Sequence, residues 1–339
     1  MEKWPKVSII ILNWNSWQDT IECLESIKNV NYKNLEVIII DNASYDISSE
    51  KIIYWCIQTN VPYERRALKI EHMIIKEIYM QKGHVNCGCA IKNLILLELN
   101  KNVGFCKGNN IAMEQAIANG ADFLLILNND TIVTPNFLKP MVEVAEKQND
   151  AGLVGGIICY ANRPDMIWFA GGTFNSYLES YRRFDNHSIS EINPGEVIES
   201  EWISGCMMLI PKHIYINIGE FDEQYFIWSE EWDYCLRVRK AGYRMFVVSD
   251  ALIYHKVGRS LGVMKPLSYY YGTRNRLLLK RKYLSPAKRM LFVFFFVLLR
   301  IIRYSWFGVY GRWDLVYAGC AAIRDYFLGR TGKWKSHRD

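Results

Sequence analysis

One apolar run constrains the fold more than any other stretch of this 339-residue chain. Five apolar residues, Phe123–Leu127, lead directly into Asn128, Asn129 and Asp130. A short apolar run bounded by turn-forming residues is typical of a strand buried on both faces of a parallel sheet. Ligands bind at the carboxyl ends of such strands, and carboxylate and amide oxygens are ligands for a hard divalent cation. The tripeptide also has the composition of an ordinary polar turn, so both interpretations stay open here.

Two earlier apolar runs predict the rest of a parallel unit. Val7–Leu12 and Leu35–Ile40 read as strands, and a segment with helical spacing over 17–28 lies between them. A strand, a helix and a second strand within about 35 residues form a right-handed βαβ unit. The two strands end in Asn13 and Asp41. Because no Gly-x-Gly-x-x-Gly pattern follows the first strand, a dinucleotide-binding dehydrogenase is disfavoured.

The next segment predicts a long helical stretch and then a ligand loop. Residues 48–91 read as mostly helical, without an assignable role, and Leu94–Leu99 reads as a strand. The Gly- and Asn-rich segment 100–110 then opens a helix. Backbone N–H groups at such a helix start favour anions, although a flexible connection explains the composition equally well.

The second half carries an acidic cluster and a histidine that ends a strand. Strands are predicted at Leu153–Tyr160, Ile167–Phe174 and Trp202–Ile210, with an irregular, acceptor-side region between the last two. Glu230, Glu231 and Asp233 then begin a helix, where acids are favoured by the helix dipole.

Three acids in five residues exceed what capping needs, and Asp233 also has a structural partner in Arg237 at i+4. Two short strands, 244–248 and 252–254, deliver His255, which is either a ligand or a packed core histidine.

Charge is distributed unevenly along the chain. From Lys256 onward there are 18 Lys and Arg against 3 Asp and Glu, whereas the remainder is net acidic. Such a basic end faces phosphates, of lipid or of nucleic acid. Met290–Leu299 is a ten-residue apolar run beside this charge. A spanning helix needs about 20 apolar residues, so the run predicts a helix at or re-entering an anionic membrane surface, rather than nucleic-acid binding. A helix buried on the catalytic domain and a dimer face are the alternatives.

Nine cysteines, an odd number, are scattered through apolar segments. This usage fits buried thiols in a reducing compartment better than a disulfide framework.

Taken together, these segments resemble the family 2 glycosyltransferases, in particular the rhamnosyltransferase-like branch that acts in surface-glycan assembly. The matching pieces occur in the family's order from Val7 to Ser260: VSIIILNWN, VIIIDNAS, NKNVGFCKGNN, LLILNNDTIV, WISGCMMLI, GEFDEQYFIWSEEWDYCLRVRKAGY and ALIYHKVGRS. The resemblance implies an α/β GT-A fold, a Rossmann-like and mainly parallel sheet flanked by helices. On this basis residues 1–260 form the transferase domain, with 48–91 as a helical insertion. Residues 261–339 form a basic, apolar helical segment that associates with the membrane.

The resemblance also assigns roles to individual residues. The positions that match the nucleotide-sugar site are Asn13, Asp41, Asn102, Gly104 and Asn129. Asp130 matches the last position of the D-x-D motif that binds Mg²⁺ or Mn²⁺, and His255 matches a histidine that completes this metal site. Glu231 matches the general base, with Glu230 as the alternative. Two departures stand out: Asn128 replaces the first Asp of D-x-D, and Glu replaces Asp in the usual Glu-Asp pair.

The resemblance implies an inverting, metal-dependent transferase. The expected donor is a nucleoside-diphosphate sugar, dTDP-rhamnose or a UDP-sugar, and the expected acceptor is a glycan or polyprenyl-linked lipid. The expected location is cytoplasmic and peripheral, on the inner face of the cell membrane. A catalytically impaired nucleotide-sugar or glycan-binding partner subunit is the alternative. A sugar-1-phosphate nucleotidyltransferase is disfavoured, because no Gly-rich, basic loop follows the first strand.

Overall fold

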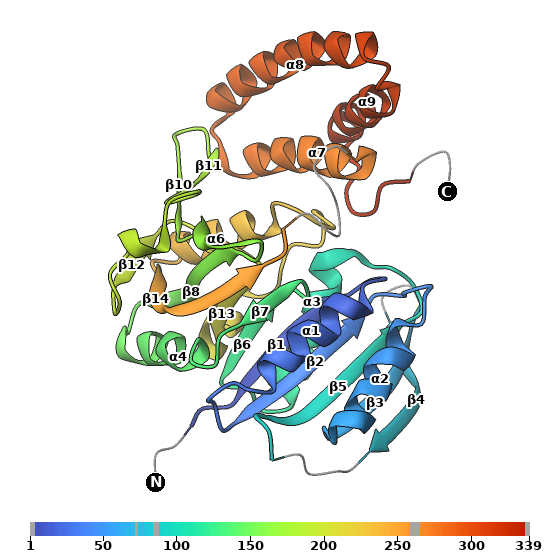
Figure 1. Ribbon diagram of the computed structural model, residues 1–339. Helices are drawn as coiled ribbons and strands as arrows, with labels where there is room; N and C mark the ends of the chain where they lie inside the picture. Colours follow the sequence, from blue (N-terminus) through green and yellow to red (C-terminus); the bar gives the residue numbers. More distant parts are fainter. Residues whose placement is uncertain (1–3, 72–73, 84–87, 258–264, 336–339) are drawn as a thin grey trace.

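One large sheet organises the chain up to His255, and a helical bundle follows it (Figure 1). The computed structural model describes residues 4–71, 74–83, 88–257 and 265–335. The strands are β1 (Val7–Asn13), β2 (Leu35–Asp41), β3 (Tyr63–Glu71), β4 (Ile74–Gly83), β5 (Ile91–Leu99), β6 (Phe123–Leu127), β7 (Thr131–Val133), β8 (Ala151–Tyr160), β9 (Arg163–Phe169), β10 (Gly172–Phe174), β11 (Ser180–Arg182), β12 (Val197–Ser200), β13 (Met207–Pro211) and β14 (Arg244–His255). The helices are α1 (Trp17–Ile27), α2 (Ser48–Thr59), α3 (Gly104–Ala118), α4 (Leu138–Lys147), the 3₁₀ turn η1 (Ile189–Glu191), α5 (Lys212–Ile218), α6 (Glu230–Lys240), α7 (Pro266–Tyr283), α8 (Pro286–Val309) and α9 (Trp313–Phe327).

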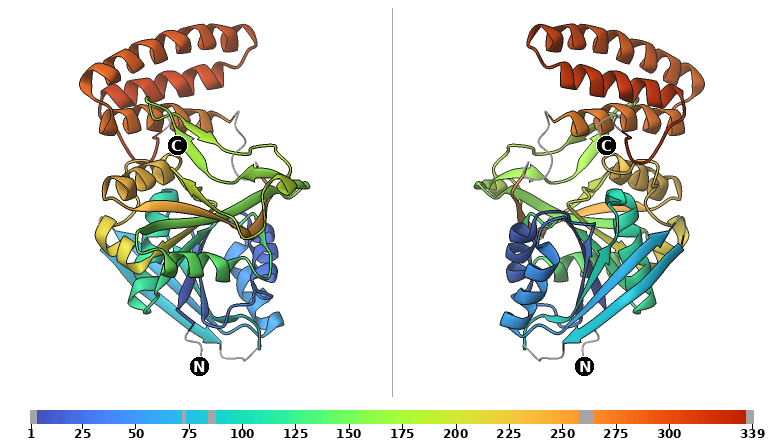
Figure 2. Two further views of the ribbon diagram at one scale, coloured as in Figure 1. Left: turned by 90° about the vertical axis from the view of Figure 1, so that its left-hand side faces the viewer. Right: turned by 90° about the vertical axis from the view of Figure 1, so that its right-hand side faces the viewer.

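The first half of the sheet is parallel, as the apolar runs predict. Strands β6, β1, β2 and β5 lie side by side in this order, and their apolar side chains are buried on both faces. Helices α1 and α3 cover opposite faces of these strands (Figure 2). From β1 the chain adds β2 and β5 on one side and then β6 on the other, so the strand order reverses between β1 and β6. Open α/β sheets bind ligands at the carboxyl ends of the strands beside such a reversal. The register pairs Asn13 with Asp41 at this edge.

The expectation of a mostly helical insertion over 48–91 is wrong. Among the residues of this segment that the structure describes, only α2 is helical, and β3 and β4 extend the sheet, with β3 parallel to β5 and β4 antiparallel to β3. These strands carry many charged side chains because β4, the edge strand, is exposed along almost its whole length, and β3 beside it is only partly buried. Arg65 on β3, for example, is paired with Glu98 on β5 at 2.8 Å. Charge at a sheet edge also blunts further strand pairing, and it hides the period-2 pattern of a strand.

The second half of the sheet brings two distant polar residues together. Strand β13 is antiparallel to β6 and β8, and β14 is parallel to β8. The two short strands expected over 244–254 form one strand, β14, with a register shift between Val248 and Leu252. The short strand β7 pairs with the end of β14, and Thr131 lies opposite His255. Asp130, which precedes Thr131, is placed beside His255 by this pairing. The region expected to be irregular, 175–200, contains β11, which pairs with β10 just before it, the turn η1, and β12, which pairs with β14.

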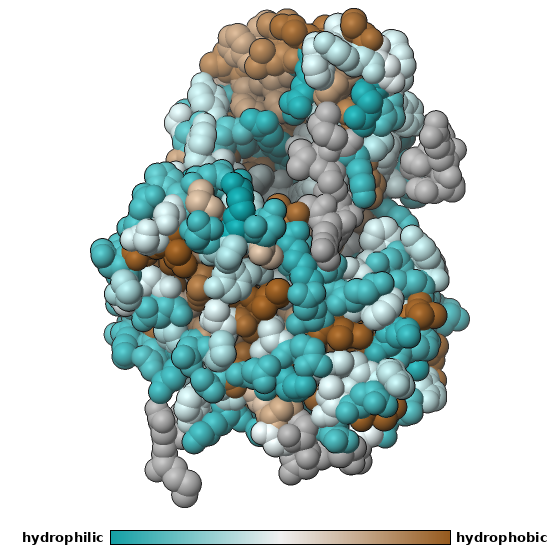
Figure 3. Space-filling view, in the orientation of Figure 1, coloured by the Kyte–Doolittle hydropathy of each residue, from teal (hydrophilic) through white to brown (hydrophobic). Residues whose placement is uncertain are grey.

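The C-terminal helices pack on the end of the molecule opposite to the N-terminus (Figures 1 and 2). Helix α8 has 24 residues, longer than the ten-residue apolar run predicts. It continues because Arg300 and Arg303 stack their guanidinium groups on aromatic rings of the bundle, while Ile301 and Ile302 extend the apolar outer face. By length and composition alone, α8 could cross a membrane, and only 11% of its most apolar 18-residue window is buried. The outer surface of α8 is the brown region at the top of Figure 3.

Candidate active site

A cleft of about 350 Å³ lies at the carboxyl edge of the sheet, between its two halves. Six of the residues predicted for the site line it: Asn128, Asn129, Asp130, Glu230, Glu231 and His255. They come from the end of β6, the start of α6 and the end of β14. The interpretation of Asn128–Asp130 as only a polar turn is therefore incomplete, because the turn forms a wall of the cleft.

Asp130 and His255 form the first polar pair in the cleft. The Nε2 atom of His255 lies 3.2 Å from Oδ1 of Asp130, and both side chains are largely buried. The Nδ1 atom of His255 is buried and has no hydrogen-bond partner among the described residues. The indole of Trp168 packs edge-on against the imidazole, with ring centroids 4.7 Å apart. The imidazole is thus held against the carboxylate by packing.

This pair could hold a divalent cation only if a bound substrate and water supplied the remaining coordinating atoms. Within the described ranges, no group of three or more His, Cys, Asp or Glu side chains converges on one point. Mg²⁺ and similar ions commonly take one or two protein ligands and fill their remaining positions with water and substrate phosphates. The donor set of one carboxylate and one imidazole, with an unpartnered ring nitrogen, therefore fits an ion that arrives with a diphosphate.

Glu230 and Glu231 form a second pair of polar side chains, across the cleft. Oε2 of Glu231 accepts a hydrogen bond from the backbone N–H of Gly205 at 3.2 Å. Oε2 of Glu230 is buried without a partner in the described structure. Burial raises the pKa of both carboxyl groups, and repulsion from Glu231 raises that of Glu230 further. A buried carboxyl with a raised pKa suits proton transfer near neutral pH.

Gly205 is a site residue that the sequence analysis missed. A Cβ at this position would lie 2.9 Å from Oε2 of Glu231, so the backbone approaches the carboxylate closely because the residue is glycine. The only signal in the sequence is that Gly205 lies in the WISGC segment, before β13.

A chain of hydrogen bonds within the protein involves the side chains of Asn13, Asp41 and Asn129. The amide of Asn13 donates to Oδ1 of Asp41 at 2.8 Å, and Asn129 donates to the hydroxyl of Thr20 at 3.1 Å. Thr20 in turn donates to Asn13 at 2.8 Å. Burial raises the pKa of Asp41, against hydrogen bonds that include those from Ser44 and Asn13. This chain of hydrogen bonds fixes the ends of β1 and β2 against α1, beside the cleft.

Asn102 and Gly104 shape the loop before α3. The side chain of Asn102 accepts a hydrogen bond from the N–H of Gly104 at 3.0 Å. Gly104 has φ +88°, and a Cβ there would lie 2.6 Å from the carbonyl oxygen of Phe226. That carbonyl accepts hydrogen bonds from the N–H groups of Phe105 and Cys106, at 2.7 and 3.2 Å. At the helix start that was predicted to favour an anion, these two N–H groups are therefore bonded to a carbonyl of the protein.

The loop that provides this carbonyl, Gln224–Ser229, is held by α7. Phe226, Trp228 and Ser229 have positive φ angles, a conformation that costs a non-glycine residue about 1–3 kcal/mol. The Nδ2 atom of Asn275 donates to the carbonyls of Tyr225, Ile227 and Trp228, at 2.8, 2.7 and 2.8 Å.

The neighbouring Arg274, fully buried, donates to the carbonyls of Gln224 and Tyr225, both at 3.2 Å. Sequence reasoning missed both α7 residues, because their partners are backbone atoms of a distant loop.

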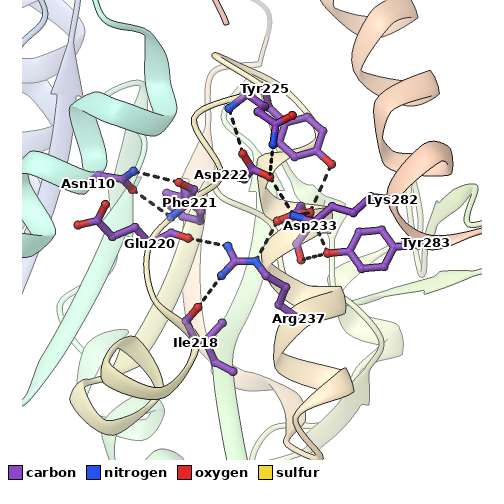
Figure 4. A network of polar contacts seen from close by, with 11 residues as sticks. Asn110, Ile218, Glu220, Phe221, Asp222, Tyr225, Asp233, Arg237, Lys282 and Tyr283 are labelled. Atoms are coloured by element: carbon purple, nitrogen blue, oxygen red, sulfur yellow. Dashed lines mark hydrogen bonds and ion pairs between the residues drawn. The ribbon is translucent and has the colours of Figure 1, made fainter. Parts of the chain in front are cut away.

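Helix α6 is fixed to α7 by a second polar network, centred on Asp233 (Figure 4). Arg237 donates to Asp233 at 2.9 Å, which confirms the predicted i, i+4 pair. Lys282 and the hydroxyl of Tyr283, both from α7, reach the same carboxylate at 2.7 and 2.8 Å. Asp233 is therefore a structural residue, while Glu230 and Glu231 remain directed at the cleft.

Comparisons with known proteins agree on one family. The family model described as "Glycosyltransferase like family 2" matches residues 87–267, just over half of the chain. The model described as "Glycosyl transferase family 2" matches residues 8–65.

Two curated relatives cover much of the chain. The dTDP-rhamnosyl transferase RfbF of Shigella flexneri is 21% identical over 201 residues, 57% of this chain and 64% of that protein. The N-acetylglucosaminyl-diphospho-decaprenol L-rhamnosyltransferase of Mycobacterium tuberculosis is 24% identical over 270 residues, 73% of this chain and 79% of that protein. The chain therefore spans less than two thirds of the first relative and more than three quarters of the second.

Solved structures share the fold. GalNAc-T7, solved with UDP, GalNAc and Mn²⁺, aligns with a TM-score of 0.55 and 14% identity over 75% of this chain and 44% of that one. The mannosyltransferase PcManGT from Pyrobaculum calidifontis, solved with GDP-Man and Mn²⁺, aligns with a TM-score of 0.52 and 13% identity over 97% and 89%. These likenesses confirm the predicted GT-A fold.

The buried carboxyl pair predicts an unusual dependence of stability on pH. A carboxyl with a raised pKa in the folded state binds its proton more tightly there than in the unfolded chain. The free energy of unfolding then falls as the pH rises above the ordinary carboxyl value of 4.5. Glu230→Gln should raise the free energy of unfolding at neutral pH by about 1 kcal/mol or more and flatten this dependence.

Urea denaturation at a series of pH values measures this effect. Glu114→Gln, at an exposed position on α3, is the control and should leave the pH dependence unchanged. A Glu230→Gln protein that is less stable than the parent at neutral pH would contradict the prediction.

Proposed function

The chain belongs to the family 2 glycosyltransferases, and from this premise we propose that it transfers a sugar from a nucleoside-diphosphate sugar to an acceptor hydroxyl, with inversion at the anomeric carbon. The observation that carries the proposal is the placement of Asp130 and His255 on one wall of a single cleft and Glu231 on another. Both curated relatives are named as rhamnosyltransferases, and one is named for a diphospho-decaprenol acceptor. We therefore take dTDP-rhamnose as the leading donor, with UDP-sugars next, and a lipid-linked or glycan acceptor.

The chain's own residues account for the proton transfer in this reaction. The carboxylate of Glu231, held by the N–H of Gly205, accepts the proton of the acceptor hydroxyl. The acceptor oxygen then forms its bond to the anomeric carbon as the bond to the diphosphate breaks, and the diphosphate leaves with the electron pair. Mg²⁺ or Mn²⁺, when bound, neutralises charge on the leaving diphosphate, and Asp130 and His255 are the residues that would hold the ion.

The rival interpretation is a partner subunit that binds a nucleotide sugar without turnover. It would need the departures at Asn128 and Glu231 to have disabled the site. The Asp130–His255 pair and the fixed Glu231 carboxylate support an active enzyme instead. An assay for transfer or hydrolysis of the donor sugar distinguishes the two functions, because only the enzyme turns the donor over.

Donor binding should depend on a divalent cation through Asp130. Calorimetry with dTDP, UDP and GDP, each with and without Mn²⁺, should give tight, metal-dependent binding of one nucleotide. Asp130→Asn should lose the increment in affinity that Mn²⁺ provides, because the neutral amide is a weaker ligand for a hard cation. Asp165→Asn, an exposed position on β9, is the matched control. Metal-dependent affinity that persists in Asp130→Asn rules out the ligand role.

Glu231 should control turnover rather than donor binding. Glu231→Gln should lower kcat by about 10²–10⁴ and leave the nucleotide Kd unchanged, because the amide cannot accept the hydroxyl proton. Because burial raises the pKa of Glu231, kcat/KM of the parent should rise with pH in a range well above 4.5. Initial-rate assays across pH measure both effects. A larger loss in Glu230→Gln than in Glu231→Gln would transfer the role of base to Glu230.

The apolar outer face of α8 should bind the membrane. We propose that α8 lies in the plane of the membrane surface, because Phe296 and Phe307 anchor its inner side to the bundle. The large outward side chains Phe294, Leu298 and Ile302 are 63%, 45% and 64% exposed. Replacing all three with Ser should weaken sedimentation with phosphatidylglycerol vesicles by more than about tenfold, since each loses apolar burial in the lipid.

The matched control for this experiment lies on the other side of the molecule. Ile74→Ser, Ile78→Ser and Met80→Ser together remove three exposed apolar side chains from β4. This control should sediment like the parent. Equal losses in both triple variants would show that α8 is not the membrane face.

A further inference from the structure

A second cavity, of about 380 Å³, adjoins the active site. It shares Trp228 and Glu231 with the first cleft, so the proposed base lies in a wall common to both. The donor side of Glu231 contains Asp130 and His255. The other side is lined by α7 and by the segment that joins β10 to β11. An acceptor has to approach Glu231 from a side that the donor does not fill, and this second cavity provides one.

Two cations from one side of α7 line this second cavity. Arg276 and Lys280 are four residues apart, and both are paired with Glu179. The ammonium of Lys280 lies 2.8 Å from Glu179, its side chain is only 2% exposed, and it also donates to the carbonyl of Leu178 at 2.7 Å. The Arg276 side chain is 38% exposed. Apart from the proposed base Glu231 itself, the two cations of this cavity share a single carboxylate among the described residues, that of Glu179.

The positive charge continues from α7 onto α8. The guanidinium groups of Arg276 and Arg300 both lie against the ring of Phe296, at 5.5 and 4.7 Å from its centroid. Arg300 and Arg303 likewise share the ring of Tyr269, at 5.2 and 5.6 Å. We name Arg276, Lys280, Arg300 and Arg303 the cationic track.

The cationic track lacks enough carboxylates to balance it. In the part of the chain that the structure describes, Arg300 and Arg303 form no ion pair, and Glu179 is the only carboxylate paired with the other two. Like charges held close together repel, so the arrangement opposes folding unless an anion joins it. Guanidinium groups are suited to this task because they bind phosphate oxygens in a bidentate manner.

We propose that the cationic track binds the diphosphate of a lipid acceptor. This inference rests on the proposed function and adds to it the recognition of the acceptor. The track begins in the cavity beside Glu231 and ends on α8, whose outer face is apolar. A sugar-linked polyprenyl diphosphate bound there would have its sugar directed toward Glu231 and its polyprenyl chain directed along α8 into the membrane. Inorganic pyrophosphate shares the headgroup chemistry, so the test has to separate the two sources.

Vesicle binding by the full-length protein tests the proposal without donor sugar or turnover. One set of phosphatidylcholine vesicles carries a polyprenyl diphosphate, and a second set carries phosphatidylglycerol at equal negative charge. The parent protein should prefer the first set. Arg276→Gln and Arg300→Gln should each lower the affinity for that set by about tenfold, the scale of a lost hydrogen bond to a charged group, and remove the preference.

Arg330→Gln is the matched control. It removes the same charge from the segment after α9, where Arg330 is 61% exposed and pairs with Asp325 at 3.4 Å, and it should keep the preference. Thermal unfolding verifies that each variant is folded, and Arg303→Gln, at an exposed position, replaces Arg300→Gln if that protein does not fold.

Three results would overturn the proposal. The first is a diphosphate preference that survives in the track variants, and the second is an equal loss in Arg330→Gln. The third is inorganic pyrophosphate that binds the parent as tightly as the diphosphate vesicles, which would assign the track to a soluble anion. Because the assay needs no transfer, a failure of the proposed enzymatic activity leaves these outcomes distinct.

Discussion

The active site depends on a loop held in a conformation that its own residues disfavour. Phe226, Trp228 and Ser229 all have positive φ angles, and the amide of Asn275 holds the carbonyls between them. The carbonyl of Phe226 closes the start of α3 on one side, and the loop leads into Glu230 on the other. The loop before α3, the proposed base and the C-terminal bundle are therefore held together through this one loop. Helix α7 contributes to the active site in this way, although it does not line the main cleft.

Charge burial is the recurring cost of this arrangement. Glu230 is buried and Glu231 is half-buried, burial disfavours the charged form of both carboxyl groups, and Lys280 is almost fully enclosed. Other buried charges have partners nearby: the carboxylate of Asp233 is paired with Arg237 and Lys282 and accepts a hydrogen bond from Tyr283. Glu230 and Glu231, which line the cleft, have no cation as a partner in the described part of the chain. Buried groups with shifted pKa values of this kind are typical of sites that bind or transform a substrate.

The sequence predicted those parts of the molecule that depend on local pattern. The buried strands β1, β2 and β6 read directly as apolar runs, and Asp130, His255, Glu230 and Glu231 were predicted as site candidates because each lies at the start or end of a recognisable element. Strands β3 and β4 were misread as helix because β4 is exposed along almost its whole length and β3 is only partly buried, so charged side chains interrupt the alternation of a half-buried strand. The roles of Asn275 and Gly205 were out of reach, since each depends on contacts between segments that only the folded chain brings together.

The rigid link between α8 and the catalytic cleft has a consequence for kinetics. With α8 embedded as proposed, α7 fixes the height of Glu231 above the lipid surface and allows little variation. The enzyme then searches for its acceptor in two dimensions, by lateral diffusion. Its rate would follow the surface density of acceptor within the bilayer, so diluting the acceptor with inert lipid would slow it even when the total amount of acceptor in the sample stayed constant.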